Sequence, residues 1–139
     1  MRVTFALAPM LLFCACYGSG KAEASSLDDG VDRYRRAEGS QKTSELQAVT
    51  DLPCTAVEVC EAKEACLAAM RTTTRALALK DEVARMLGDL QGKRLALDAE
   101  AAQSLPAKLD EATLLLQEGR AKMTDCEKKL ADLGLHYGH

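Results

Sequence analysis

The stretch LDEATLLLQEGRAKMTDCEKKLADL, residues 109–133, decides the fold class. Large apolar residues recur in it every seven positions, namely Leu109, Leu116, Met123 and Leu130. A second row, offset by three positions, is mostly small: Ala112, Gly119, Cys126 and Leu133. A seven-residue repeat of this kind is typical of a helix that packs closely along a partner helix. The stretch therefore predicts an all-α fold with coiled-coil-like packing.

The partner helix is expected upstream. Thr55-Ala-Val-Glu58 has the spacing of a capping box, in which the two side chains bond the free backbone amides of a helix start. We therefore predict a main helix from Thr55 towards Gly88, with Cys60, Leu67, Met70 and Leu77 on its apolar side. The turn that follows it lies either near Gly92 or near Pro106.

A shorter helix is predicted over residues 43–52, with Leu46 and Val49 on its apolar side. Pro53 ends it, because the residue before a proline is pushed out of the helical region. The expected architecture is therefore a helical hairpin or a small three-helix bundle.

Composition and charge narrow the class of protein. A chain of 139 residues forms one small domain, and with only 4% aromatic residues its core must consist of aliphatic side chains. The net charge is −3, with both signs mixed along the chain, so we expect no nucleic-acid partner.

The N-terminus reads as an export signal. Residues 3–13 (VTFALAPMLLF) form an uncharged run that is too short for a membrane span, which needs about 20 residues, but that fits a secretory signal. A buried N-terminal helix or strand is the alternative. Cleavage near Gly18 or after Ala24 would give a soluble secreted protein.

Ala15-Cys16 resembles the lipobox of bacterial lipoprotein precursors, although Phe13 and Cys14 depart from the usual residues there. The resemblance implies that residues 1–15 are a signal peptide and that Cys16 is acylated, with palmitate among its chains, and becomes the mature N-terminus. Since Tyr17 follows Cys16, it further implies the outer membrane, with the periplasm or secretion as alternatives.

Residues 17–42 are rich in Gly, Ser and charge, so they predict a flexible, lipid-anchored tether over residues 16–42. Arg33-Tyr-Arg-Arg36 is interpreted as a solvated charge cluster. A helical domain then covers residues 43–135, and residues 136–139 form a loose tail.

Four cysteines remain in the mature chain: Cys54, Cys60, Cys66 and Cys126. In an exported protein an even number suggests disulfides. Cys54–Cys60 is the least strained local pair, since Cys54 precedes the helix and can curl back. Cys66–Cys126 would then staple the long helices, which requires a hairpin centred near residue 96. A turn nearer Gly92 favours Cys60–Cys126 instead.

No catalytic residue, metal ligand or cofactor site is predicted. The five-residue gaps between Cys54, Cys60 and Cys66 do not match common zinc sites, and His136 and His139 lie in the expected tail. We expect no enzyme. Two function classes remain: a structural or interaction module of the cell envelope, with an envelope protein or a second copy on the heptad face as partner, or a small-ligand or metal-binding helical protein.

Overall fold

The structure is a computed structural model that describes the backbone of residues 15–138 and side chains from residue 19. The regular secondary structure of this part of the chain is all helical: α1 (Ala15–Arg36), α2 (Gln41–Asp51), α3 (Val57–Gln91), α4 (Glu100–Gln103) and α5 (Leu105–Tyr137). The predicted all-α class is confirmed. The predicted signal peptide lies, apart from Ala15, outside the described residues.

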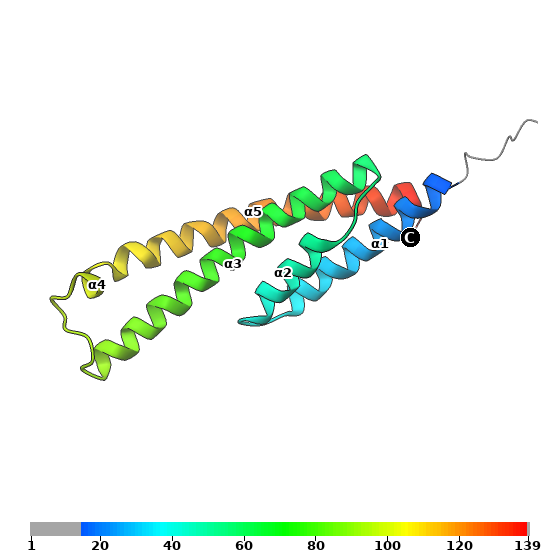
Figure 1. Ribbon diagram of the computed structural model, residues 1–139. Coiled ribbons are helices and arrows are strands. Elements are labelled where there is room, and N and C mark those ends of the chain that lie inside the picture. The colour runs from blue at the N-terminus through cyan, green and yellow to red at the C-terminus, as the bar shows by residue number, and fades with distance from the viewer. Residues whose placement is uncertain (1–14, 139) are drawn as a thin grey trace, which may run out of the picture.

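The two longest helices, α3 and α5, run antiparallel along their length and form a hairpin (Figure 1). Helix α3 ends at Gln91, and the amide of Gly92 closes it by donating to the carbonyl of Gly88. Pro106 lies in the first turn of α5, where its missing N–H costs nothing. The connection therefore spans residues 92–104, and the short α4 lies within it.

The small row of the seven-residue repeat faces α3. Its four members, Ala112, Gly119, Cys126 and Leu133, are all buried. The row of large residues lies beside the contact line, with Leu109 half exposed and Met123 and Leu130 packed against the core. At Gly119 the helices approach so closely that a Cβ atom would lie 2.5 Å from Oγ1 of Thr73.

The predicted flexible tether is wrong where the structure describes it. Residues 15–36 form helix α1, and Ala24, Leu27, Val31 and Tyr34 are buried on it. Their spacing of three and four residues puts them on one helical face. This narrow apolar stripe packs α1 against the core, although most of the other residues of α1 are small or charged.

Tyr34 is the largest buried side chain of α1. Its hydroxyl donates to the carbonyl of Met70 at 2.9 Å and also lies 2.9 Å from Oγ1 of Thr74. The interpretation of Arg33–Arg36 as a solvated cluster is therefore wrong for Tyr34, while the arginines beside it are exposed.

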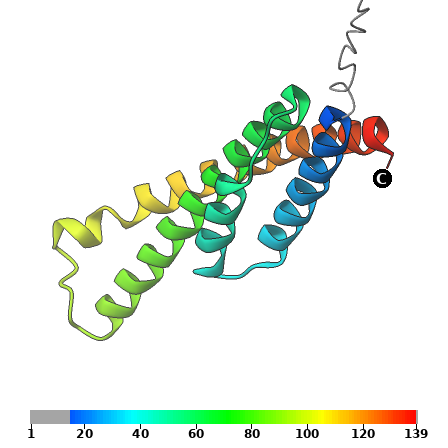
Figure 2. The ribbon, with the colours of Figure 1, turned by 45° about the vertical axis from the view of Figure 1, so that its right-hand side comes forward.

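Helix α2 confirms the predicted short helix and begins two residues earlier. Val49 is buried on it, and the helix ends before Pro53. In both ribbon views α1 and α2 lie side by side along one half of the hairpin, and the other half extends past them (Figures 1 and 2). We call residues 77–116, which lie beyond the contacts of Tyr34 with Met70 and Thr74, the arm.

The opposite end of the hairpin is the base, where the first turns of α1 meet the start of α3 and the end of α5. Gly20 lies against the ring of Tyr137, and Tyr137 is buried. The predicted loose tail is therefore wrong for residues 136 and 137, because α5 continues through them and the ring fills the space beside Gly20. The folded body starts in α1, well before residue 43.

Candidate functional site

Two disulfides join the four predicted cysteines. Cys54 bonds Cys60 with a Cα–Cα distance of 5.2 Å, and Cys66 bonds Cys126 with a Cα–Cα distance of 4.6 Å. This confirms the predicted pairing and excludes Cys60–Cys126. The connection between α3 and α5 extends over residues 92–104 and is not a tight turn at Gly92. Cys66 on α3 therefore lies opposite Cys126 on α5.

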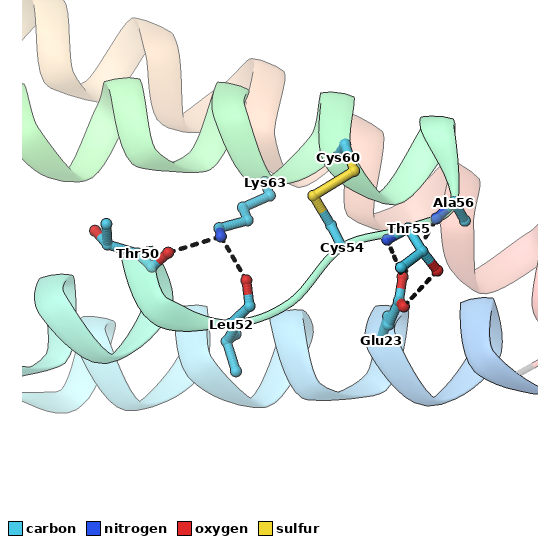
Figure 3. The surroundings of a disulfide bond; sticks show 8 residues. All are labelled: Glu23, Thr50, Leu52, Cys54, Thr55, Ala56, Cys60 and Lys63. Carbon is cyan, nitrogen blue, oxygen red and sulfur yellow. Dashed lines mark hydrogen bonds between the residues drawn. A yellow bond between two sulfur atoms is a disulfide. The ribbon is translucent and has the colours of Figure 1, made fainter.

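The two bonds lie in different surroundings. Cys66 and Cys126 are fully buried in the core, on the contact line of α3 and α5. Cys54 and Cys60 are only partly buried, and they tie the linker between α2 and α3 to the first turns of α3 (Figure 3). Disulfides persist outside the reducing cytoplasm, so this protein belongs to an oxidising compartment.

A carboxylate of α1 binds the linker immediately before α3. Glu23 accepts hydrogen bonds from the amide and hydroxyl of Thr55, at 2.8 and 2.7 Å, and from the amide of Ala56 at 3.4 Å (Figure 3). The bond from the Thr55 amide is the main reason why the pKa of Glu23 lies below its usual value. The predicted capping box is therefore wrong: α3 begins at Val57, and Thr55 bonds Glu23 instead of capping the helix itself.

Lys63 holds the other side of the same linker. Its ammonium group donates to the carbonyls of Thr50 and Leu52, at 2.7 and 2.5 Å (Figure 3). These two carbonyls belong to the end of α2, where helix carbonyls have no intrahelical partner. Glu23, Lys63 and the Cys54–Cys60 bond therefore fix the linker at three separate points.

The base carries a small polar cluster. Tyr137 donates a hydrogen bond to Glu58 at 2.5 Å, and this bond is the main cause of the lowered pKa of Glu58. His136 lies 3.7 Å from the same carboxylate, so it is part of the folded base. The cluster borders a shallow hollow of ≈ 470 Å³ that also touches Glu61, Lys129, Asp132 and Leu133. Among the described residues, no three His, Cys, Asp or Glu side chains are arranged to hold a metal ion.

Most of the exposed leucines lie in the arm. Four leucines there have large exposed fractions, Leu87 (46%), Leu97 (84%), Leu109 (49%) and Leu114 (65%), and one further exposed leucine, Leu135 (85%), lies at the base. Leu109 stands in the same row of α5 as Met123 and Leu130, which pack against the core that α1 and α2 complete. Seven residues return to the same face of a helix in such a hairpin. The row that packs against the core at Met123 and Leu130 is therefore open to solvent at Leu109.

Cys16, the predicted lipidation site, lies in the first turn of α1, and its side chain is not among those described. No helix in the described part of the chain is long and apolar enough to cross a bilayer.

Glu23, Tyr34 and Lys63 have roles that the sequence pattern does not predict. Each acts on a segment 11 to 40 residues away. The stripe of Leu27, Val31 and Tyr34 was the one available signal, since it has helical spacing. A comparison with family models, curated proteins and solved structures finds no match.

Proposed function

We propose that this protein is an exported, lipid-anchored interaction module of the cell envelope, with the acyl chains on Cys16 and the arm as its binding element. The observation that carries the proposal is the uneven cover of the hairpin. Helices α1 and α2 shield one half of it, and four leucines of the other half face solvent, whereas Leu135 is the one leucine of comparable exposure among the described residues of the shielded half. Contiguous exposed apolar patches mark sites where proteins bind other molecules, and we take the leucines of the arm as part of such a patch.

The anchor rests on the lipobox-like Ala15-Cys16 and is supported by the disulfides, which require an oxidising compartment that an exported protein reaches. A Tyr rather than an Asp after Cys16 favours the outer membrane as the destination.

The arrangement of base and arm fits this role. Helix α1 starts at the base, so a lipid on Cys16 would hold the base next to the bilayer. Helix α3 has 35 residues, which at 1.5 Å per residue amounts to about 52 Å. The far end of the arm would then reach roughly 50 Å from the base, although no flexible tether contributes.

Anchoring is tested by labelling the host with an alkyne palmitate and comparing the native chain with the variant Cys16→Ser. We expect the label and membrane association to disappear together in the variant. A variant that is still cleaved, acylated and membrane-bound would refute the anchor at Cys16.

Binding by the arm is tested by placing a photo-crosslinking amino acid in the host protein at Leu97, Leu109 or Leu114. The matched control is Ser25, which is exposed on α1 at the covered half. We expect a discrete crosslinked product from the arm positions and none from Ser25. Equal products from all four positions, or none from the arm, would refute the binding role.

A further inference from the structure

The two disulfides differ in how a reacting molecule can reach them. Cys66 and Cys126 are both 0% exposed, so attack on either sulfur requires the two long helices to separate. Cys54 and Cys60 keep part of their surface in solvent. Thiol–disulfide exchange needs a direct approach of the attacking thiolate to one sulfur. Only the Cys54–Cys60 bond offers this approach in the folded protein.

Cys60 also lines an open hollow of ≈ 520 Å³ at the start of α3. Its other lining residues are Thr55, Val57, Glu61, Glu64 and Lys129. Val57 is 71% exposed, which is unusual for a branched apolar side chain and gives a partner protein apolar surface beside the sulfur. The hollow provides room for a cysteine side chain carried on the surface of another protein.

The fold is built to survive opening of this bond. The linker keeps the two carbonyls that Lys63 binds and the amides of Thr55 and Ala56 that Glu23 binds (Figure 3). None of these contacts involves a sulfur atom. The buried Cys66–Cys126 bond continues to join α3 to α5. Reduction of Cys54–Cys60 would therefore leave the helices in place, and the bond could form again.

We propose that Cys54–Cys60 is a thiol–disulfide exchange site that reacts with the dithiol of a partner protein, while Cys66–Cys126 remains a structural bond. In the first step a partner thiolate attacks the sulfur of Cys60. The Cys54–Cys60 bond breaks, a mixed disulfide forms between Cys60 and the partner, and Cys54 leaves as a thiolate that takes up a proton.

In the second step the partner's other thiolate attacks its own sulfur in the mixed disulfide. Cys60 leaves as a thiolate and is protonated, and the partner becomes a disulfide. Two electrons and two protons pass from the partner dithiol to the Cys54–Cys60 pair. The reverse sequence oxidises the pair again.

The test uses the full chain with both disulfides formed, in buffer without denaturant. The protein is treated with dithiothreitol, or with reduced thioredoxin as the protein dithiol, and samples are quenched with acid and alkylated with N-ethylmaleimide. Peptide mapping then gives the rate at which each pair is labelled. Far-ultraviolet circular dichroism follows the helix content of the same samples.

We expect both reagents to open Cys54–Cys60 at least ten times faster than Cys66–Cys126, with the helical signal unchanged while the first pair is open. Equal rates, or faster opening of Cys66–Cys126, would overturn the proposal. So would a loss of helical signal in step with opening of Cys54–Cys60. Reaction with dithiothreitol but not with thioredoxin would overturn the assignment of a protein dithiol as the reductant.

The attacked sulfur is tested with a thioredoxin in which serine replaces the resolving cysteine, so that the mixed disulfide accumulates. We expect the trapped thioredoxin on Cys60. Trapping on Cys54 would contradict the first step as written, and trapping on Cys66 or Cys126 would overturn the proposal. The variant Cys54→Ser/Cys60→Ser is the control and should trap none.

Discussion

Replacement of Gly119 by alanine is the sharpest test of the packing between α3 and α5. The new Cβ would lie 2.5 Å from Oγ1 of Thr73 and 3.3 Å from its backbone nitrogen. The hydroxyl of Thr73 can turn to a second rotamer, but its nitrogen and Cα belong to the backbone of α3 and cannot move without the helix. The two helices must therefore separate locally.

Two opposing effects set the magnitude. Alanine is favoured over glycine inside a helix by about 1 kcal/mol. Forcing an extra carbon into a packed contact costs about 1–3 kcal/mol, and contact with backbone on the facing helix places this case in the upper part of that range. We therefore expect Gly119→Ala to lower the free energy of unfolding by about 1–2 kcal/mol.

Gly88→Ala is the matched control. Gly88 is also inside a helix, but an added Cβ there meets nothing within 4 Å. Only the gain in helix propensity remains, so this variant should be more stable than the native chain by about 1 kcal/mol. The same substitution at two glycines is thus expected to change stability in opposite directions.

The assay is urea unfolding under non-reducing conditions, followed by circular dichroism. The double variant Thr73→Ala/Gly119→Ala should recover much of the loss, because the clashing oxygen is absent. If Gly119→Ala is as stable as Gly88→Ala, the close approach of the two helices at this position is wrong.

Three further predictions concern individual contacts. Cys126→Ser should lower the free energy of unfolding by about 4 kcal/mol in oxidising buffer and by far less in reducing buffer, because the lost bond closes a separation of 60 residues; similar losses in both buffers would contradict this account. Tyr34→Phe removes the bond to the Met70 carbonyl and should cost about 1 kcal/mol in thermal or urea unfolding, whereas an unchanged midpoint would mean that the bond contributes nothing. The pKa of Glu23 is lowered on folding, so its contribution is present above the unfolded-state value, near 4.5, and is lost as the pH falls through the folded-state value. Glu23→Gln should therefore weaken the dependence of stability on acid pH, and a titration curve with the same slope as that of the native chain would refute this role.

The long hairpin could be predicted from the sequence because its signal is local and repeated. The row of Ala112, Gly119 and Cys126 defines the face of α5 that contacts α3. In the same way, Pro53 marks the end of α2. The disulfide pairing could be narrowed for a similar reason, since it depends only on helix rise and on the position of one turn. The remaining ambiguity was the position of the turn, because Gly92 and Pro106 are competing signals: the connection over residues 92–104 begins at Gly92, and Pro106 follows it in the first turn of α5.

Helix α1 could not be predicted with the same reasoning because its stability comes from tertiary contacts. Its charged and small residues resemble a linker in composition, and the four buried residues have meaning only once a groove exists to receive them. The same holds for Glu23, which replaces the expected capping box. Both Thr55 and Glu58 have the correct spacing for a box, but spacing cannot show that a carboxylate from another helix reaches Thr55 first.

The uneven cover of the hairpin has a consequence for local opening. Around the base and the covered half, α3 and α5 have further helices packed on them, but in the arm each helix has mainly the other as its neighbour (Figure 2). Amide hydrogens of the arm should therefore exchange with solvent sooner, in a gradient that rises towards residues 92–104. Fraying that starts at this end would travel down the paired helices until it reached Cys66–Cys126, where a covalent bond holds α3 and α5 together. The buried disulfide thus separates the arm, which can open locally, from the base and the covered half, which open only when the whole protein unfolds.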